Sequence, residues 1–380
     1  MRPLPFLIVN LCCKDNTLLI FILTFSAIEN DFNFIRMWLN INRKISHGLY
    51  FLNLLSIKRI VNLLKLTTSF FLSRLIRKPM VKGKPWTISV EPSGQCNLQC
   101  PECPVGAAVL NRKGGFMTTE LFQKTVQQAG KSLFYINFFF QGEPTLNPHI
   151  AQMLTIATEN RIYSNMSTNG HLLTPERSRA LVQSGLSRVI VSVDGLTSET
   201  YAIYRRGGSL FKTDTGIRNL ISARNSLKSK TPFITVQFLV FRHNEHEIPL
   251  LKNWCKTVGA DQLEIKTAQF NDYGDGSVKP PVNSKYSRYN LAKDGSLQHK
   301  GRIYNHCFKQ WGGMVVSWDG QSAPCCYDKN LDFSAGNIKD ISFNGIWDSD
   351  KMKDFRNQIL NNKKAIDMCR NCPEGRNPLL

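Results

Sequence analysis

Alternation of apolar and polar residues predicts a series of short strands through the middle of the chain. Residues 86–91 alternate in this way, and Pro92, Ser93 and Gly94 end the pattern. Apolar segments and helical patterns then follow one another along the chain. The predicted strands are residues 86–91, 135–140, 162–167, 189–193, 233–241 and 262–266, and the predicted helices include residues 149–160, 175–184 and 211–228.

Strand–helix alternation of this kind predicts a mostly parallel sheet. We count about six such units, whereas a complete TIM barrel has eight. The expected fold class is therefore α/β, with residues 85–270 forming a partial (β/α)6 TIM-like barrel.

Residues 49–78 show apolar positions near helical spacing, with Lys58, Arg59, Lys65, Arg74, Arg77 and Lys78 between them. A basic amphipathic helix can lie on an anionic membrane surface. The same pattern also suits a helix that packs against the barrel and leaves its lysines in water. Charges interrupt every apolar stretch, which argues against a membrane-spanning segment.

The first 36 residues fit neither a spanning helix nor a secretory signal. The apolar run at residues 18–25 is about half the length that spanning requires. Few basic residues precede it, and no clear small-residue cleavage site follows. Met37 is a better candidate for the first residue, so we expect part of residues 1–36 to be upstream read-through.

The composition is that of a globular protein, with 42% hydrophobic and 20% charged residues. Eight of the 11 cysteines form two groups, and this uneven spacing favours metal ligation in a reducing, cytoplasmic setting over a disulfide framework. Net charge is +20, and residues 1–85 hold 13 Lys and Arg against 3 Asp and Glu. Half of the excess charge therefore lies outside the barrel, and no RNA-binding module is visible, which argues against a nucleic-acid partner.

Cys96, Cys100 and Cys103 form a C-x3-C-x2-C pattern on the loop that follows the first predicted strand. In a β/α barrel, loops at that end of the strands carry the chemistry. A [4Fe–4S] cluster is usually held by four cysteines, so three leave one iron open for a ligand. A structural zinc site is the alternative, since short cysteine motifs give false matches.

This run resembles the signature of the radical S-adenosylmethionine (SAM) superfamily. There the open iron binds the amino and carboxylate groups of SAM, whose cleavage yields methionine and a 5′-deoxyadenosyl radical. Polar motifs at later strand ends match the family in order. The resemblance implies a SAM site made by Gly142, Glu143, Pro144, Ser167, Thr168, Asn169, Ser192, Asp194 and Arg205. A zwitterionic ligand suits this set, because a carboxylate can face its ammonium and an arginine its carboxylate.

A second group of cysteines lies near the C-terminus and resembles the auxiliary-cluster extension of the same family. That extension is called SPASM when it holds two clusters and twitch when it holds one. Four thiolates suffice for one [4Fe–4S] cluster, although they also suit zinc. We expect the ligands to be Cys307, Cys325, Cys369 and Cys372, with Cys326 as a spare.

The expected organisation is a basic helical extension (1–84), a barrel (85–270), a linker (271–306) and an auxiliary-cluster domain (307–380). The resemblance implies an enzyme that abstracts hydrogen from a peptide, sugar or lipid-linked substrate, in a net oxidation or modification supplied with electrons by flavodoxin or ferredoxin. Gln237 and Lys266 are candidates for the barrel mouth. The alternatives are an RNA-modifying radical SAM enzyme and a non-catalytic iron–sulfur or zinc scaffold at the membrane. Cytoplasmic location, with peripheral contact at the inner membrane face through residues 49–78, is the expected setting.

Overall fold

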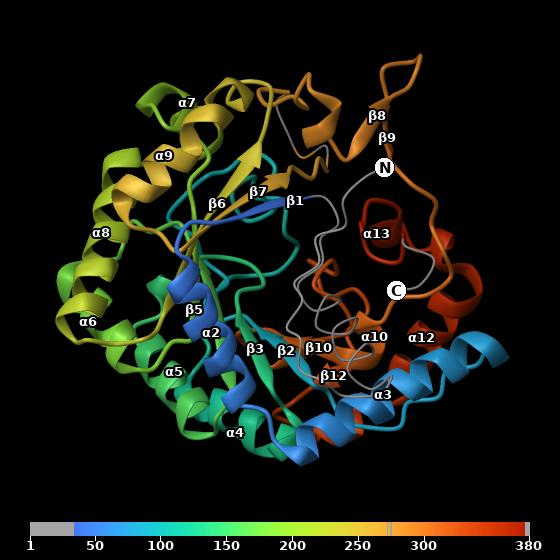
Figure 1. The fold of residues 1–380 in the computed structure, drawn as a ribbon. Helices are drawn as coiled ribbons and strands as arrows, with labels where there is room; N and C mark the ends of the chain where they lie inside the picture. The colour runs from blue at the N-terminus through green and yellow to red at the C-terminus, as the bar shows by residue number, and fades with distance from the viewer. Residues whose placement is uncertain (1–33, 272, 274–275, 377–380) are drawn as a thin grey trace, which may run out of the picture.

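Six parallel strands form the centre of the protein (Figure 1), as the sequence predicts. The computed structural model describes residues 34–271, 273 and 276–376. Each of these strands pairs with the next along the chain, so connections between neighbours are direct. The strands are β2 (Thr87–Val90), β3 (Tyr135–Phe138), β4 (Tyr163–Thr168), β5 (Arg188–Ser192), β6 (Phe233–Val240) and β7 (Gln262–Thr267).

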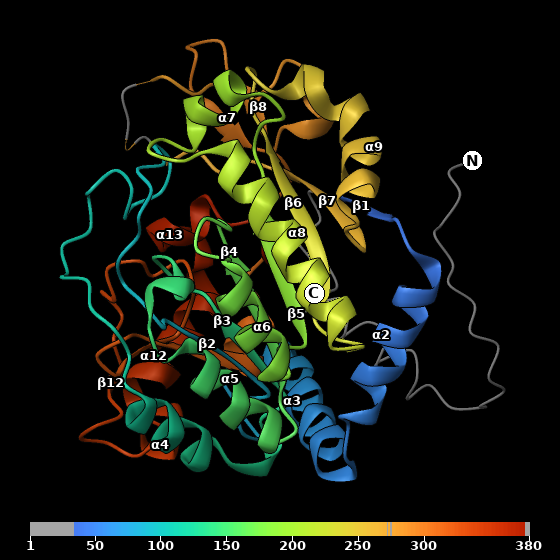
Figure 2. The same cartoon turned by 90° about the vertical axis from the view of Figure 1, so that its left-hand side faces the viewer.

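Helices follow the strands and cover the outer face of the sheet (Figure 2). Threonine caps start three of them, because Thr118, Thr174 and Thr197 accept hydrogen bonds from backbone N–H groups three residues later. The apolar faces of these helices pack on the strands to form the main core. The helices are α4 (Thr119–Ala129), α5 (Ile150–Glu159), α6 (Pro175–Gln183), α7 (Ser198–Tyr204), α8 (Leu210–Ser226) and α9 (Ile248–Val258).

A strand from the N-terminal extension closes one edge of the sheet. β1 (Phe34–Trp38) pairs antiparallel with β7, with Phe34 opposite Lys266. Arg36 forms an ion pair with Glu264 at 3.0 Å. Residues 34–36 thus belong to the sheet. The other residues of the stretch 1–36, part of which we expected to be upstream read-through, lie outside the described part of the chain.

The C-terminal segment extends the other edge of the same sheet. β10 (Gly313–Val316) pairs in parallel with β2, and β11 (Gln321–Ala323) and β12 (Gly336–Asn337) continue antiparallel beyond it. A Cβ on Gly313 would lie 2.4 Å from the Thr87 carbonyl oxygen, so this close strand pair requires glycine. One ten-stranded sheet therefore crosses the boundaries that we expected at residues 84 and 306.

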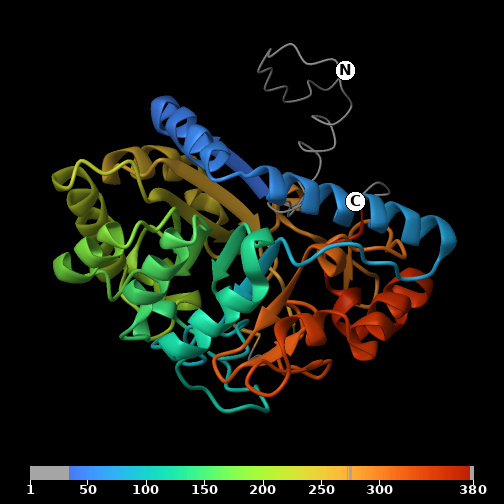
Figure 3. The same ribbon diagram turned by 90° about the horizontal axis from the view of Figure 1, so that it is seen from below.

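The predicted amphipathic stretch at residues 49–78 consists of two helices, α2 (Ile41–Asn53) and α3 (Ile57–Ile76). Both lie along one side of the molecule (Figure 3). The buried Arg59 guanidinium donates to Arg161 O at 2.6 Å and Asn160 O at 3.1 Å, in the loop that precedes β4. The helices therefore cover the N-terminal ends of the barrel strands.

The segment at residues 271–306 is more ordered than the predicted linker. It contains a hairpin of β8 (Tyr289–Leu291) and β9 (Leu297–His299). The buried Arg288 guanidinium donates to Thr267 O at 2.6 Å, which ties the segment to the end of β7. The remaining helices are α10 (Lys309–Gly312), α11 (Phe343–Trp347), α12 (Asp350–Asn362) and α13 (Asp367–Arg370).

The inner face of α3 joins the N-terminal extension to the C-terminal segment. Phe70 is fully buried, and its ring packs edge-on against Phe308 at 5.3 Å and Trp311 at 5.4 Å between centroids. Its neighbour Phe71 is 46% exposed. Both phenylalanines lie on α3, but only Phe70 is fully buried. Substitutions at the two positions therefore distinguish the effect of packing from the effect of helix formation.

We expect Phe70→Ala to lower the free energy of unfolding by about 3–5 kcal/mol, because it leaves a cavity between α3 and α10. Phe71→Ala should change it by less than about 1 kcal/mol, since the ring stays largely in water. Urea unfolding followed by circular dichroism measures both. Equal effects of the two substitutions would contradict the packing role of this face.

Candidate functional site

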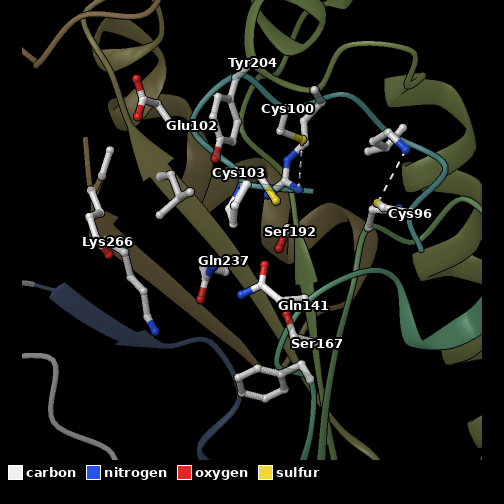
Figure 4. A pocket seen from close by; sticks show the side chains of 18 of the residues that line it. Cys96, Cys100, Glu102, Cys103, Gln141, Ser167, Ser192, Tyr204, Gln237 and Lys266 are labelled. Carbon is white, nitrogen blue, oxygen red and sulfur yellow. Dashed lines mark hydrogen bonds between the residues drawn. The ribbon is translucent and has the colours of Figure 1, made fainter. Parts of the chain in front are cut away.

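A cavity of about 400 Å³ lies at the C-terminal ends of the parallel strands (Figure 4). This volume is within the range of about 300–1,000 Å³ that small-ligand sites occupy. All six barrel strands, or the loops that follow them, contribute lining residues. Tyr327 and Lys329 of the C-terminal segment also line it. The position is the one at which β/α barrels place their active sites.

The loop after β2 brings Cys96, Cys100 and Cys103 to the wall of this cavity (Figure 4). Within the loop, Leu98 N donates to Cys96 Sγ at 3.4 Å, and Cys103 N donates to Cys100 O at 3.1 Å. Burial raises the pKa of the Cys96 thiol to about 11 and that of the Cys100 thiol to about 12. Iron ligation needs thiolates, so loading a cluster here must release protons.

Gly142 allows the loop after β3 to approach the backbone of the cysteine loop. Its φ is +68°, and a Cβ here would lie 2.3 Å from Ser93 O and 2.6 Å from Gln95 O. Next to it, Glu143 N donates to Gln95 O at 2.8 Å. The two loops therefore support each other through backbone contacts that no larger residue than glycine permits.

The Glu143 carboxylate is buried and binds only neighbouring protein groups among the contacts that the structure describes. Oε1 accepts hydrogen bonds from Thr145 N at 3.0 Å and from Thr168 Oγ1 at 2.7 Å. Oε2 accepts from Asn169 N at 2.8 Å. The Thr145 hydroxyl donates to Oε1 as well. Four donors thus bind this carboxylate, three at Oε1 and one at Oε2, and they link the loop after β3 to the end of β4.

Arg205 joins a buried acid to the cysteine loop. Its guanidinium Nη2 lies 2.5 Å from Asp194 Oδ2, and Nη1 lies 3.9 Å from Cys100 Sγ. The other Asp194 oxygen accepts from Leu239 N at 2.7 Å. Burial disfavours charge on Arg205, but Asp194 and Cys100 hold its pKa well above the ordinary value. The arginine stays charged and places its positive end beside a candidate cluster ligand.

The C-terminal cysteines gather around Cys307, which is buried beside Cys369 in a small apolar cluster. Burial and then the neighbouring Cys307 raise the pKa of the Cys369 thiol to about 12. Tyr327 N donates to Cys325 Sγ at 3.4 Å, and Glu374 N donates to Cys372 Sγ at the same distance. Such backbone donors stabilise thiolates and are a common feature of cluster-binding loops.

Comparison with known families decides the identity of this site. Residues 90–254 match the sequence profile of the radical SAM superfamily. Residues 307–373 match the profile of the SPASM iron–sulfur cluster-binding domain, and the two matches together span more than half of the chain.

The chain belongs to the radical SAM superfamily. Relatives of this radical SAM enzyme carry varied names. It is 26% identical over 312 residues to the tungsten-containing aldehyde ferredoxin oxidoreductase cofactor-modifying protein of Pyrococcus furiosus, an alignment that covers 74% of this chain and 86% of that protein. It is 24% identical over 305 residues to the PqqA peptide cyclase of Gluconobacter oxydans, with 76% and 82% covered. The predicted family and enzymatic nature are confirmed.

A solved structure supports the fold. The crystal structure of Streptococcus suis SuiB bound to S-adenosylmethionine superposes with a TM-score of 0.58 at 15% identity, covering 82% of this chain and 75% of SuiB. The predicted α/β fold class, with a barrel and a C-terminal auxiliary domain, is confirmed. The radical SAM enzyme and the SuiB chain share this architecture despite their low identity.

The cofactors of the radical SAM enzyme are SAM, a [4Fe–4S] cluster and auxiliary iron–sulfur in the SPASM domain, as the resemblance implies. Among the described residues, no three His, Cys, Asp or Glu side chains converge on a point where one metal ion could sit. A zinc ion draws thiolates to about 2.3 Å from a single centre. Each cysteine of a cubane cluster binds a different iron, so the three cysteines that line the cavity can hold such a cluster.

The structure brings together most of the side chains that the resemblance assigns to SAM. Besides the three cysteines, Gly142, Glu143, Ser167, Thr168, Asn169, Ser192 and Arg205 all line the cavity. Pro144 and Asp194 are buried behind the wall, and Asp194 contacts Arg205 instead of the cavity. Gln237 and Lys266 line the cavity from β6 and β7. These strands are separated by β5 from β4, which carries Ser167.

Several lining residues escape prediction from the sequence. Phe140 and Gln141 precede the glycine of the β3 loop and could have been found from that position. Glu102 lies between two of the cysteines, so its place was also accessible to sequence reasoning. Tyr327 and Lys329 offer no such signal, because only the fold of the C-terminal segment carries them to the barrel.

We expect Gly142→Ala to destabilise the radical SAM enzyme more than Gly130→Ala does. Gly130 has a similar φ of +70°, but a Cβ there would have nothing within 4 Å. Gly130→Ala should therefore cost about 1–3 kcal/mol from backbone strain alone, because its ψ of −169° lies in a region that only glycine commonly adopts. Gly142→Ala should cost about 1–3 kcal/mol more, because its Cβ collides with the cysteine loop.

Urea unfolding of the cluster-free chain measures both variants. Both variants place a Cβ on a residue with positive φ, so a larger loss of stability for Gly142→Ala reports the contact with the cysteine loop. Equal midpoints would show that the two loops do not depend on this close approach.

Proposed function

We propose that Cys96, Cys100 and Cys103 hold the SAM-binding [4Fe–4S] cluster and that the SPASM domain holds one auxiliary [4Fe–4S] cluster. The place of the first three cysteines in the cavity supports the first assignment. The second rests on the buried or half-buried thiols of Cys307, Cys325, Cys369 and Cys372, because the last three each lie near enough to Cys307 for it to raise their pKa. When bound, the reduced cluster and SAM supply a 5′-deoxyadenosyl radical that can abstract hydrogen from an unactivated carbon.

The β4–β5 side of the cavity is the proposed SAM side. Ser167, Asn169 and Ser192 present hydroxyl and amide groups there. Asn169 Nδ2 also donates to Asn97 Oδ1 at 2.8 Å, which ties this wall to the cysteine loop. Three of the four donors to Glu143 bind Oε1, so Oε2, with one donor, keeps an acceptor site for the methionyl amine, the contact that the resemblance implies.

The β6–β7 side is the proposed substrate side. Lys266 and Arg288 line it, with Glu102 as an acidic neighbour and Gln237 as a neutral hydrogen-bonding group. Lys329 adds a third cation to the cavity, over the Phe140 ring at the end of β3. Two of these residues come from segments beyond the barrel. Cationic side chains in a partly enclosed cavity favour a substrate that carries anionic groups.

The main support for this proposal is that residues 325–329 contribute both to the auxiliary cysteines and to the wall of the cavity. Cys325 belongs to the auxiliary cysteines, and Tyr327 and Lys329 line the cavity. An auxiliary cluster at Cys325 would therefore lie close to a bound substrate and could accept an electron from it. We infer a net oxidation of the substrate, in which residues 85–270 hold SAM and residues 307–380 hold the electron acceptor.

The proposed substrate is a peptide. The related Gluconobacter oxydans protein is named as a peptide cyclase, while the Pyrococcus furiosus protein is named for a cofactor. A peptide offers both the unactivated carbons that need radical chemistry and backbone groups for the polar cavity wall. The test is designed to distinguish a peptide substrate from sugar, lipid-linked and RNA substrates.

We expect anaerobic reconstitution of the wild-type chain to yield about eight irons per chain. The triple substitution of Cys96, Cys100 and Cys103 by alanine should retain about four and form no 5′-deoxyadenosine. Iron counting and chromatography of the SAM products measure both. About four irons in the wild type, with zinc at the C-terminal cysteines, would remove the electron-acceptor role and keep the radical chemistry.

The peptide fraction for this test comes from the cells that naturally make the enzyme, grown in deuterated medium. We expect 5′-deoxyadenosine to gain one deuterium when the enzyme acts on this fraction. The radical takes its hydrogen from the substrate, so the label identifies the fraction that contains it. Protease treatment of the fraction should abolish the label. Mass spectrometry of 5′-deoxyadenosine is the measurement, and the triple-cysteine variant is the control.

Lipid, nucleotide-sugar and RNA fractions from the same cells form the other arms. Label from one of these arms that survives protease would replace the peptide by that substrate class. Absence of 5′-deoxyadenosine from every arm, with the clusters loaded, would contradict the assignment of the SAM site.

A further inference from the structure

The helix α2 exposes a continuous apolar stripe. Ile41, Ile45, Leu49 and Leu52 lie four, four and three residues apart, which places them on one face of the helix. Their side chains are between 54% and 63% exposed. Single exposed leucines are common on proteins, but four on one helix face mark a surface that binds something.

The helix α3 continues this stripe. Ile57, Val61, Leu72 and Leu75 share one of its faces, opposite the buried Phe70. Ile57 and Leu75, near the two ends of the helix, are 81% and 80% exposed. Figure 3 shows the two helices following one another along one side of the molecule, outside the barrel. We call the eight apolar residues named above, four on α2 and four on α3, the outer face.

The charge around the outer face has a single sign. Residues 34–84 contain no Asp or Glu. Exposed lysines and arginines border the apolar stripe on α3, namely Lys58, Lys65, Arg77 and Lys78. An apolar stripe flanked by basic residues is the pattern of a helix that lies in the headgroup region of a membrane. Each basic residue near an anionic surface adds about 1 kcal/mol of attraction.

We propose that the outer face docks the protein onto an anionic lipid bilayer. A second copy of this chain fits less well, because two acid-free surfaces repel each other. A nucleic acid would meet the basic residues but leave the isoleucines and leucines without apolar partners. No helix among the described residues is both long and apolar enough to cross a bilayer, so the contact is peripheral. This inference does not depend on the proposed substrate.

Vesicle sedimentation with the full-length protein tests the proposal. The vesicles contain phosphatidylcholine with about one-third phosphatidylglycerol, and pure phosphatidylcholine serves as the neutral arm. We expect binding to the anionic vesicles, at least tenfold weaker binding to the neutral ones, and a loss of affinity as salt is raised.

A matched pair of variants isolates the outer face. Leu49 on α2 is 63% exposed, and Leu250 on α9 is 59% exposed. Leu49→Glu should weaken binding at least tenfold, because it places an acid in the apolar stripe, and Leu250→Glu should leave binding unchanged. Leu49→Glu/Leu75→Glu should abolish binding by altering both helices. Unchanged thermal midpoints would show that each variant folds.

Three results would overturn the proposal. The first is wild-type protein that ignores anionic vesicles. The second is Leu49→Glu/Leu75→Glu that binds them as well as the wild type, which would assign the contact to another surface. The third is a wild-type dimer in light scattering that the same double substitution dissociates, which would make a second copy the occupant.

Discussion

The parallel pairing of β2 with β10 is the constraint on which the catalytic arrangement depends. β2 leads into the cysteine loop, and β10 leads through β11 to Cys325, so one strand pair fixes both cysteine groups to the same sheet. The buried Glu91 carboxylate at the end of β2 reinforces this junction. It forms an ion pair with Arg112 at 2.5 Å and accepts from Trp318 N at 3.2 Å. Arg112 also donates to Lys329 O at 2.9 Å, beside the cavity. Because burying charges is costly, such a pair contributes more to position than to net stability.

The local parts of this arrangement could be predicted from the sequence, and the pairing could not. Each barrel strand lies within a few residues of its predicted place, because alternation is a property of neighbouring residues. The partners of β1 and β10 are more than 200 residues away, and no local pattern encodes them. The hairpin at residues 289–299, in contrast, could have been predicted. Asp294 and Gly295 are a turn signal between its two strands, but the polar composition of the segment led us to predict a loop.

For the candidate site, too, the sequence predicted which residues take part but not what each of them contacts. The ordered motifs at the strand ends identified side chains that the fold does bring to one cavity. They did not identify the partners of those side chains. Glu143 finds donors on Thr168 and Asn169, and Asp194 finds Arg205, because buried charges bind the nearest complementary groups. A motif therefore assigns residues to a site more securely than it assigns each residue a contact with the ligand.

The N-terminal helices and the cavity lie at opposite ends of the barrel, which bears on how substrate arrives. Arg43 on α2 donates to Ser229 O, and Arg59 donates to Arg161 O, and both acceptors lie in loops that precede barrel strands. The cavity opens where those strands end. A bilayer docked on the outer face would thus meet the closed end of the barrel and leave the cavity facing water. A peptide dissolved in water can enter such a cavity directly, whereas a lipid-linked substrate would have to leave the membrane and pass around the barrel. The proposed membrane contact and the proposed peptide substrate are therefore consistent, because docking at the closed end favours substrates delivered from solution.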